Sequence, residues 1–270
     1  MRVLIPIAAV LLAGCGGDAM VVDRDRHATP PYDGQLNAGA AVGALECDGK
    51  TPYERGEGVY DDGLATVQES AKAALENYVR EEGLSFSEPS AGYAVEREQD
   101  GRALLSYDVE GRTKVSIVAT DDVRDWDHDQ GWGVRAWAQC DPSEFPPKVT
   151  DDLNIGVWED ESGGRVPVTR IMSFQGAEHC SWTGITFLLV GSERKADWYV
   201  RDTDGELSEL LRTTFASDAT LPEDATDTGL RRDGRQLWIG ADDDAAYLVS
   251  LDDARDVERW PAAKQPIRCA

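Results

Sequence analysis

Hydrophobic and polar positions follow two different periods along the chain, and the first is helical. Apolar residues recur every three or four positions between Leu64 and Val79, with charged residues between them. A helix of 3.6 residues per turn collects such residues on one face. We therefore predict an amphipathic helix over residues 63–83, with Asp62 as its cap and Gly83 as its stop.

The second period, apolar residues alternating with polar ones, follows this helix and predicts strands. Short turn sequences at residues 99–101 and 110–111 separate the first three strands, which is typical of an antiparallel meander. The strands expected in this part of the chain are residues 92–98, 103–109, 113–120 and 131–139. A helix packed on such a sheet gives an α+β domain over residues 45–148.

The remaining chain carries almost only the strand pattern, which predicts a mainly antiparallel β domain over residues 149–270. Its expected strands are residues 155–159, 166–173, 183–190, 198–201, 236–239 and 246–251. We expect a short helix at 206–213 and an acidic surface loop at 215–228. The boundary between the domains is placed at residues 141–152, where the adjacent Pro146 and Pro147 oppose a regular element.

The net charge of the chain limits which binding partners are expected. The 270 residues include 51 acidic and 27 basic side chains, for a formal net charge of −24, and 41% are hydrophobic. That apolar share is enough for packed cores. Binding to nucleic acid or to anionic headgroups depends on Lys and Arg, so nucleic acid is not an expected partner.

The first fifteen residues have the pattern of an export signal. Arg2 precedes a short apolar run that is too short to cross a bilayer as a helix. Residues 12–15 (LAGC) resemble the lipobox of bacterial lipoproteins. The resemblance implies that residues 1–14 are a signal peptide and that Cys15 receives a lipid that anchors the protein to the outer side of the cell membrane. Residues 15–44, rich in Gly, Pro, Asp and Ala, are then expected to form a flexible tether.

Four further cysteines remain, which is an even number in an exported chain. They are Cys47, Cys140, Cys180 and Cys269. Oxidising compartments favour disulfides, and four cysteines allow three pairings. We favour Cys47 with Cys140 and Cys180 with Cys269, because each pair brackets one expected domain. A zinc site is the alternative, but the chain lacks its typical spacing.

Three segments resemble uncharacterised secreted lipoproteins of high-GC Gram-positive (actinobacterial) bacteria. They are residues 131–145 (GWGVRAWAQCDPSEF), 179–190 (HCSWTGITFLLV) and 232–269, which contains RDGRQLWIGADDDAAYLVSLDD. The resemblance covers less than half of the chain. It implies an extracytoplasmic location and disulfides, and it implies no activity.

Two acidic turns are candidates for calcium, because hard cations prefer carboxylate ligands. In residues 202–206 (DTDGE), aligning Gly205 with the sixth place of an EF-hand loop puts Val200 and Leu211 where the end ligands should be. Residues 242–244 are three consecutive acids. A hairpin turn is the favoured interpretation of the first and a solvated turn of the second, so no metal and no cofactor is expected.

Histidines and tryptophans supply the other candidates. His179 lacks the spacing of a nucleophile and its base, and we expect it to pack beside a disulfide. His128 lies in an acidic loop, where a weak metal site is the alternative to solvation. Most of the eight Trp lie in expected strands, whereas Trp126 and Trp260 flank loops and are expected to be exposed for ligand contact.

These patterns favour a membrane-anchored binding or accessory module of the cell envelope that contacts an envelope protein or a cell-wall component. No catalytic residue is predicted. The alternative is a wall-active hydrolase whose carboxylates are distant in sequence but converge in the fold. For a glycoside, two such acids would lie roughly 5–9.5 Å apart in a cleft.

Overall fold

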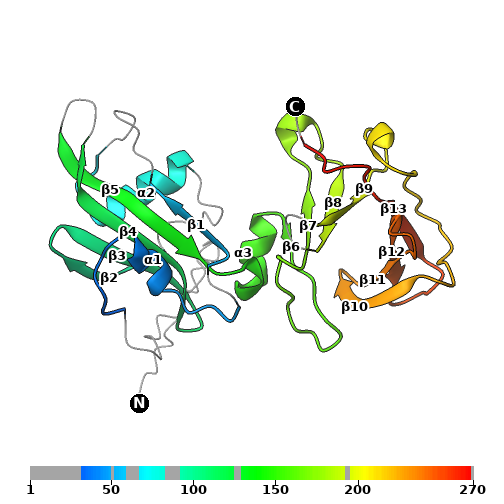
Figure 1. Ribbon diagram of the computed structural model, residues 1–270, viewed down its shortest axis with the longest axis horizontal. Coiled ribbons are helices and arrows are strands. Elements are labelled where there is room, and N and C mark those ends of the chain that lie inside the picture. The colour runs from blue at the N-terminus through cyan, green and yellow to red at the C-terminus, as the bar shows by residue number, and fades with distance from the viewer. Residues whose placement is uncertain are drawn as a thin grey trace, which may run out of the picture.

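The computed structural model describes residues 32–49, 52–58, 67–82, 92–124, 129–191 and 195–268 (Figure 1). Within these ranges, strands form three antiparallel sheets and helices are few, so the chain is mainly β. In Figure 1 the largest sheet lies on one side and the two smaller sheets lie on the other. None of the described helices is long and apolar enough to span a bilayer.

The largest sheet contains five strands in the order β1-β5-β4-β3-β2. Their bounds are β1 Glu54–Glu57, β2 Ala94–Gln99, β3 Arg102–Val109, β4 Arg112–Arg124 and β5 Gln130–Gln139. Strands β2 to β5 confirm the predicted meander, whereas β1 was not predicted. Both hairpin turns have two central residues with positive φ, Asp100 and Gly101 in one and Glu110 and Gly111 in the other. That backbone matches the twist of the flanking strands.

The helix of this region, α2, spans Ala71–Glu82 and so begins later than predicted. Two backbone hydrogen bonds between Gln68 and Trp132 hold the preceding residues against β5. The Oγ atom of Ser70 then accepts the N–H of Ala73 at 3.2 Å, as an N-cap does. The predicted cap, Asp62, and stop, Gly83, lie outside the described residues. Ala71 belongs to a buried cluster with residues of the sheet.

A short helix, α1 at Gly39–Gly43, occupies part of the chain that was predicted to be a flexible tether. Leu36, Ala40 and Ala41 are buried in one cluster with residues of β3, β4 and β5. The tether prediction is therefore wrong for residues 36–44. Small side chains let this segment approach the sheet closely, and the helix is too short to show a hydrophobic period. The rest of the predicted tether up to residue 31 lies outside the described residues.

Residues 141–152, the predicted boundary, are more regular than expected. They form a 3-10 helix, Pro142–Glu144, and helix α3, Pro147–Asp152. Proline suits the first turn of a helix, because the N–H it lacks has no partner there. The Asp141 carboxylate accepts the N–H of Val168 at 3.0 Å, so this segment is tied to the chain that follows.

The two smaller sheets each have four strands in sequential order. The first contains β6 Ile155–Gly156, β7 Ile171–Gln175, β8 Thr186–Val190 and β9 Asp197–Arg201, and the second contains β10 Thr226–Arg232, β11 Arg235–Ile239, β12 Ala245–Ser250 and β13 Val257–Pro261. The six predicted strands are present, with β6, β7 and β8 shorter than expected. Strands β10 and β13 were missed, and β10 begins inside the predicted loop. The helix predicted at 206–213 is only a 3-10 turn, Ser208–Leu210.

The edges of these two sheets are bridged on both sides. Glu159, just after β6, pairs with Arg231 of β10, and Tyr199 of β9 pairs with Ala262, just after β13. The two sheets thus enclose one interior, much as the strands of a small barrel do. A buried cluster fills it with side chains of both sheets, among them Tyr199, Leu237 and Trp260.

Candidate ligand-binding site

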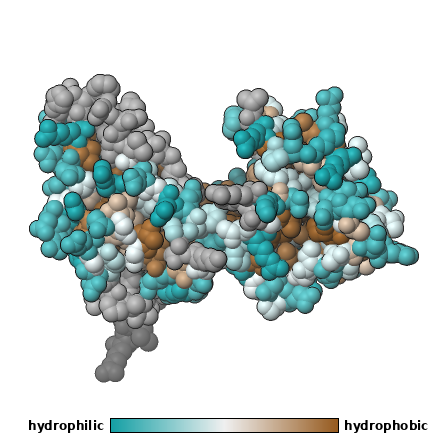
Figure 2. All heavy atoms as spheres, in the orientation of Figure 1, coloured by the Kyte–Doolittle hydropathy of each residue, from teal (hydrophilic) through white to brown (hydrophobic). Residues whose placement is uncertain are grey.

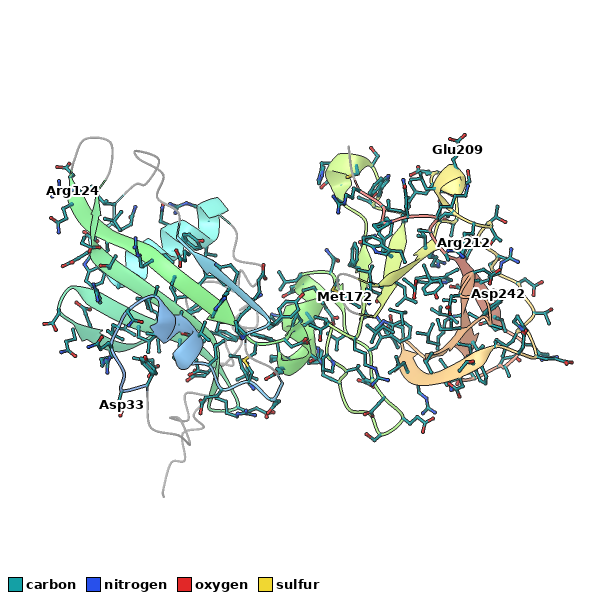
Figure 3. The ribbon with its side chains drawn as sticks, viewed as in Figure 1. Asp33, Arg124, Met172, Glu209, Arg212 and Asp242 are labelled. Carbon is teal, nitrogen blue, oxygen red and sulfur yellow. A yellow bond between two sulfur atoms is a disulfide. The ribbon has the colours of Figure 1, made fainter. Side chains whose placement is uncertain are left out.

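A cavity of about 510 Å³ lies between the two four-stranded sheets, and every strand from β6 to β13 contributes to its wall. This volume is in the range of small-molecule sites. Figure 3 shows side chains from both sheets projecting into the space between them. Figure 2 shows apolar residues over this half of the molecule surrounded by hydrophilic ones.

Three arginines line this cavity, although acidic residues outnumber basic ones in the chain. Arg201 lies on β9, Arg232 at the end of β10 and Arg235 at the start of β11, and we call them the arginine cluster. The Arg235 guanidinium is held in place: it donates to both carboxylate oxygens of Asp256 at 3.0 Å and to the carbonyl of Leu248 at 3.0 Å. Arg235 therefore has a structural role within the wall.

Glu258 is the one carboxylate of the cavity wall whose side chain is mostly buried. The indole N–H of Trp260 donates to its Oε2 at 2.8 Å. The Arg201 Nε lies 3.4 Å from the same oxygen, and Arg235 lies 3.9 Å from Oε1. These contacts compensate the charge of Glu258 and orient Arg201.

Arg201 and Arg232 each have guanidinium N–H groups without an acceptor in the described residues. No acceptor for the terminal nitrogens of Arg201 is found within the described part of the chain, and its guanidinium lies 5.4 Å from the ring centroid of Phe215. Arg232 uses Nε toward Asp233 at 2.9 Å and Nη1 toward the carbonyl of Val157 at 3.2 Å. Its Nη2 has no such partner among the same residues.

Gly156 on β6 leaves room for the Arg232 guanidinium. A Cβ atom at this position would lie 2.6 Å from Arg232 Nη1 and closer still to Ser173 Oγ. The absence of a side chain at Gly156 therefore allows Arg232 to lie across β6.

Trp158 also borders this cavity. The residue is only 1% exposed, and its Nε1 finds no hydrogen-bond partner within the described ranges. A buried N–H without an acceptor costs about 1–3 kcal/mol. Trp158 therefore belongs to the packed interior beside the cavity.

The two tryptophans predicted to be exposed have different outcomes. Trp260 is buried, which corrects the prediction: it lies on β13, a strand that the sequence pattern did not reveal, and packs in the interior between the sheets. It still borders the cavity and holds Glu258. Trp126 lies outside the described residues.

The acidic turns have structural roles. Asp202 is buried, and its carboxylate accepts the backbone N–H groups of Gly205, Glu206 and Leu207 at 2.7–3.1 Å. These bonds stabilise a tight turn after β9. The turn is not the predicted hairpin, because the next strand, β10, belongs to the other four-stranded sheet. Asp243 has a positive φ and donates its N–H to the carbonyl of Gly240, so residues 242–244 also form a turn.

The histidine predictions are corrected in part. His179 lies in a 3-10 helix, Glu178–Cys180, and is exposed rather than packed. The cause is local, because Ser181 adopts the left-handed conformation and turns the chain there. Cys180 is disulfide-bonded, whereas its predicted partner, Cys269, lies outside the described residues, as does His128.

A second cavity of about 590 Å³ lies beside the larger sheet, close to the predicted disulfide. Cys47 and Cys140 are bonded, with a Cα–Cα distance of 5.3 Å, which confirms this pairing. The Lys114 Nζ lies 2.6 Å from Glu144 Oε2, and both side chains are almost fully buried. Lys114 also donates to the carbonyl of Glu46, and Glu144 accepts the N–H of Asp48.

This second cavity does not form a metal site. Within the described residues, Cys47, Cys140 and Glu144 form the one group of three ligating side chains close enough for an ion. The two sulfur atoms are bonded to each other and are not available as ligands. The charges around this cavity therefore serve the fold.

Sequence reasoning did not find the arginine cluster, Glu258 or Trp158. Two of the strands that carry these residues, β10 and β13, show no clear alternation. The sequence signal that could have indicated this site was a set of arginines at strand ends in a strongly acidic chain.

Comparison with known proteins adds nothing to this site: no family model matches the chain, and no curated protein or solved structure is significantly similar to it.

Proposed function

We propose that the protein is an extracytoplasmic, lipid-anchored binding module and that its ligand occupies the cavity between the two four-stranded sheets. One observation carries the proposal: Arg201 and Arg232 line this cavity and keep terminal N–H donors that have no acceptor in the described part of the chain. A ligand with acceptor atoms satisfies these donors.

The location rests on the sequence. The lipobox-like residues 12–15 support a lipid on Cys15, which would tie the chain to the outer side of the cell membrane. The Cys47–Cys140 disulfide fits an oxidising compartment. We also retain, as part of this proposal, an α+β domain at residues 45–148, in which α2 packs on the larger sheet, followed by a separate β domain.

A wall-active hydrolase is less well supported. Such an enzyme needs two carboxylates on either side of the scissile bond. Glu258 is mostly buried in the cavity wall, but it is compensated by Arg201 and Trp260. The other acids of the wall, Asp151 and Asp233, are exposed.

The test uses the full chain with Cys15→Ser, which removes the lipid acceptor. Its thermal unfolding is measured with envelope extract separated into a small-solute fraction and a polymer fraction. A ligand that binds only the folded state stabilises it by RT ln(1 + [L]/Kd), so Tm rises with the logarithm of the ligand concentration once this exceeds Kd. We expect the small-solute fraction to raise Tm. If neither fraction changes Tm, the proposed function is wrong.

A separate measurement tests the anchor. The mass of the mature N-terminus is determined after detergent extraction from cells, with Cys15→Ser as the control. We expect a lipid mass on Cys15 and release of the control into the medium. An unmodified N-terminus would contradict the anchor and leave the binding proposal standing.

A further inference from the structure

The cavity between the two four-stranded sheets also indicates the chemistry of its ligand. Its volume of about 510 Å³ accommodates a small molecule and not a folded partner. Its wall contains terminal N–H donors of Arg201 and Arg232 that have no acceptor in the described residues. This inference rests on the proposed function and goes further by naming the group that is bound.

Charge compensation within the wall is uneven: each of the three arginines has a carboxylate partner, but the pairs differ in strength. Glu258 compensates Arg201, and Asp256 compensates Arg235 through two hydrogen bonds. The partner of Arg232 is Asp233, whose side chain is 80% exposed, so water screens this pair strongly. The half-buried Arg232 guanidinium therefore has the weakest compensation of the three.

The available donors suit a planar oxyanion. A guanidinium presents its N–H groups as a rigid fork that matches a carboxylate. Arg201 has both terminal nitrogens available, and Arg232 has Nη2. From these observations we propose that the cavity binds a small organic solute through its carboxylate group, with Arg201 and Arg232 as the ligands of the carboxylate. Trp158 borders the same cavity and can report on its occupation.

The test measures the indole N–H signal of Trp158 directly. The full chain with Cys15→Ser is labelled with ¹⁵N-tryptophan, and the signal is assigned from its loss in Trp158→Phe. The probes are N-acetyl-L-alanine, which carries a carboxylate and an amide carbonyl, and N-acetyl-L-alaninamide, which differs by the loss of the charge. Each is titrated to about 50 mM, above the millimolar range of weak binding.

We expect a saturable shift of the Trp158 signal with the acid and at least a tenfold weaker response to the amide. Arg201→Gln and Arg232→Gln should each weaken binding of the acid about tenfold, which is the loss of one good charge-assisted contact. Arg255→Gln is the matched control, because it removes the same charge from a side chain that is 91% exposed and does not line the cavity. It should change the affinity by less than about twofold.

The outcomes separate this inference from the proposed function. An equal response to acid and amide overturns the carboxylate and retains a binding cavity. No saturable shift with either probe overturns the inference, while the Tm measurement with envelope solutes still decides the proposed function. Inorganic phosphate and methyl glucoside serve as further probes, and a response to either one in place of the acid also overturns the carboxylate.

Discussion

The cavity beside the Cys47–Cys140 disulfide and the cavity between the smaller sheets contain similar charged groups but use them differently. Beside the disulfide, Lys114 and Glu144 are almost fully buried and 2.6 Å apart, and backbone groups of residues 46 and 48 complete their hydrogen bonding. Between the smaller sheets, Arg201 is 38% exposed, its terminal nitrogens have no acceptor in the described chain, and its carboxylate partner is 3.4 Å away.

The difference shows how burial and pairing separate a structural charge from a binding charge. A buried ion pair with all its hydrogen bonds made fixes the surrounding chain, because removal of either partner leaves the other charge desolvated. A half-exposed guanidinium with free donors contributes little to stability but is available to a ligand. The expected effects of substitutions should follow this order.

The largest effect is expected for Lys114→Met. The substitution leaves the Glu144 carboxylate buried without its cation, which should lower the free energy of unfolding by about 3–5 kcal/mol. Urea unfolding at pH 7 measures it. The double variant with Glu144→Leu should recover most of the loss, because apolar residues can replace a buried ion pair. A loss below about 1 kcal/mol for Lys114→Met alone would mean that the pair behaves as an exposed one.

The Cys47–Cys140 disulfide should contribute nearly as much. It joins residues 93 positions apart, and replacing both with Ala should lower the free energy of unfolding by about 2–5 kcal/mol. Substitution is preferable to a reducing agent, because Cys180 is also disulfide-bonded. If Tm remains unchanged in the double Ala variant, the ion pair alone determines the stability of this region.

Arg201→Gln tests the comparison in the cavity between the smaller sheets. Glu258 keeps the indole N–H of Trp260 and the nearby Arg235, so we expect a loss of about 1 kcal/mol or less in the free energy of unfolding. The same variant should lose the response to carboxylate probes. If it unfolds as readily as Lys114→Met, Arg201 is a structural residue and the contrast between the cavities does not hold.

The sequence predicted the parts of this fold that have a local cause. Type I′ turns follow from Asp100-Gly101 and Glu110-Gly111, and the strands around them alternate clearly. The α1 segment and β10 lack such a signal: Ala40 is buried because of where the chain crosses the sheet, and β10 contains Thr, Asp and Gly. The cavity could not be predicted at all, because strands far apart in the sequence form its wall.

The smallest effect is expected at the exposed edge of the cavity beside the disulfide, where Asp48 lies. A hydrogen bond from Arg112 lowers the pKa of the Asp48 carboxyl below its usual value, and Lys114 lies 3.4 Å from the same group. A carboxyl with a lowered pKa in the folded state stabilises the fold above its unfolded pKa, near 4, and this contribution is lost as the pH falls through the folded pKa. Because the Asp48 side chain is 65% exposed, water screens the pair.

We therefore expect Asp48→Asn to lower the free energy of unfolding by about 0.5 kcal/mol or less at pH 7, with the difference disappearing toward pH 2. Urea unfolding across this range measures it, and Arg112→Gln should remove the same increment without adding to Asp48→Asn in the double variant. A difference that stays constant down to pH 2 would show that the charge of the Asp48 side chain is not the cause of its contribution.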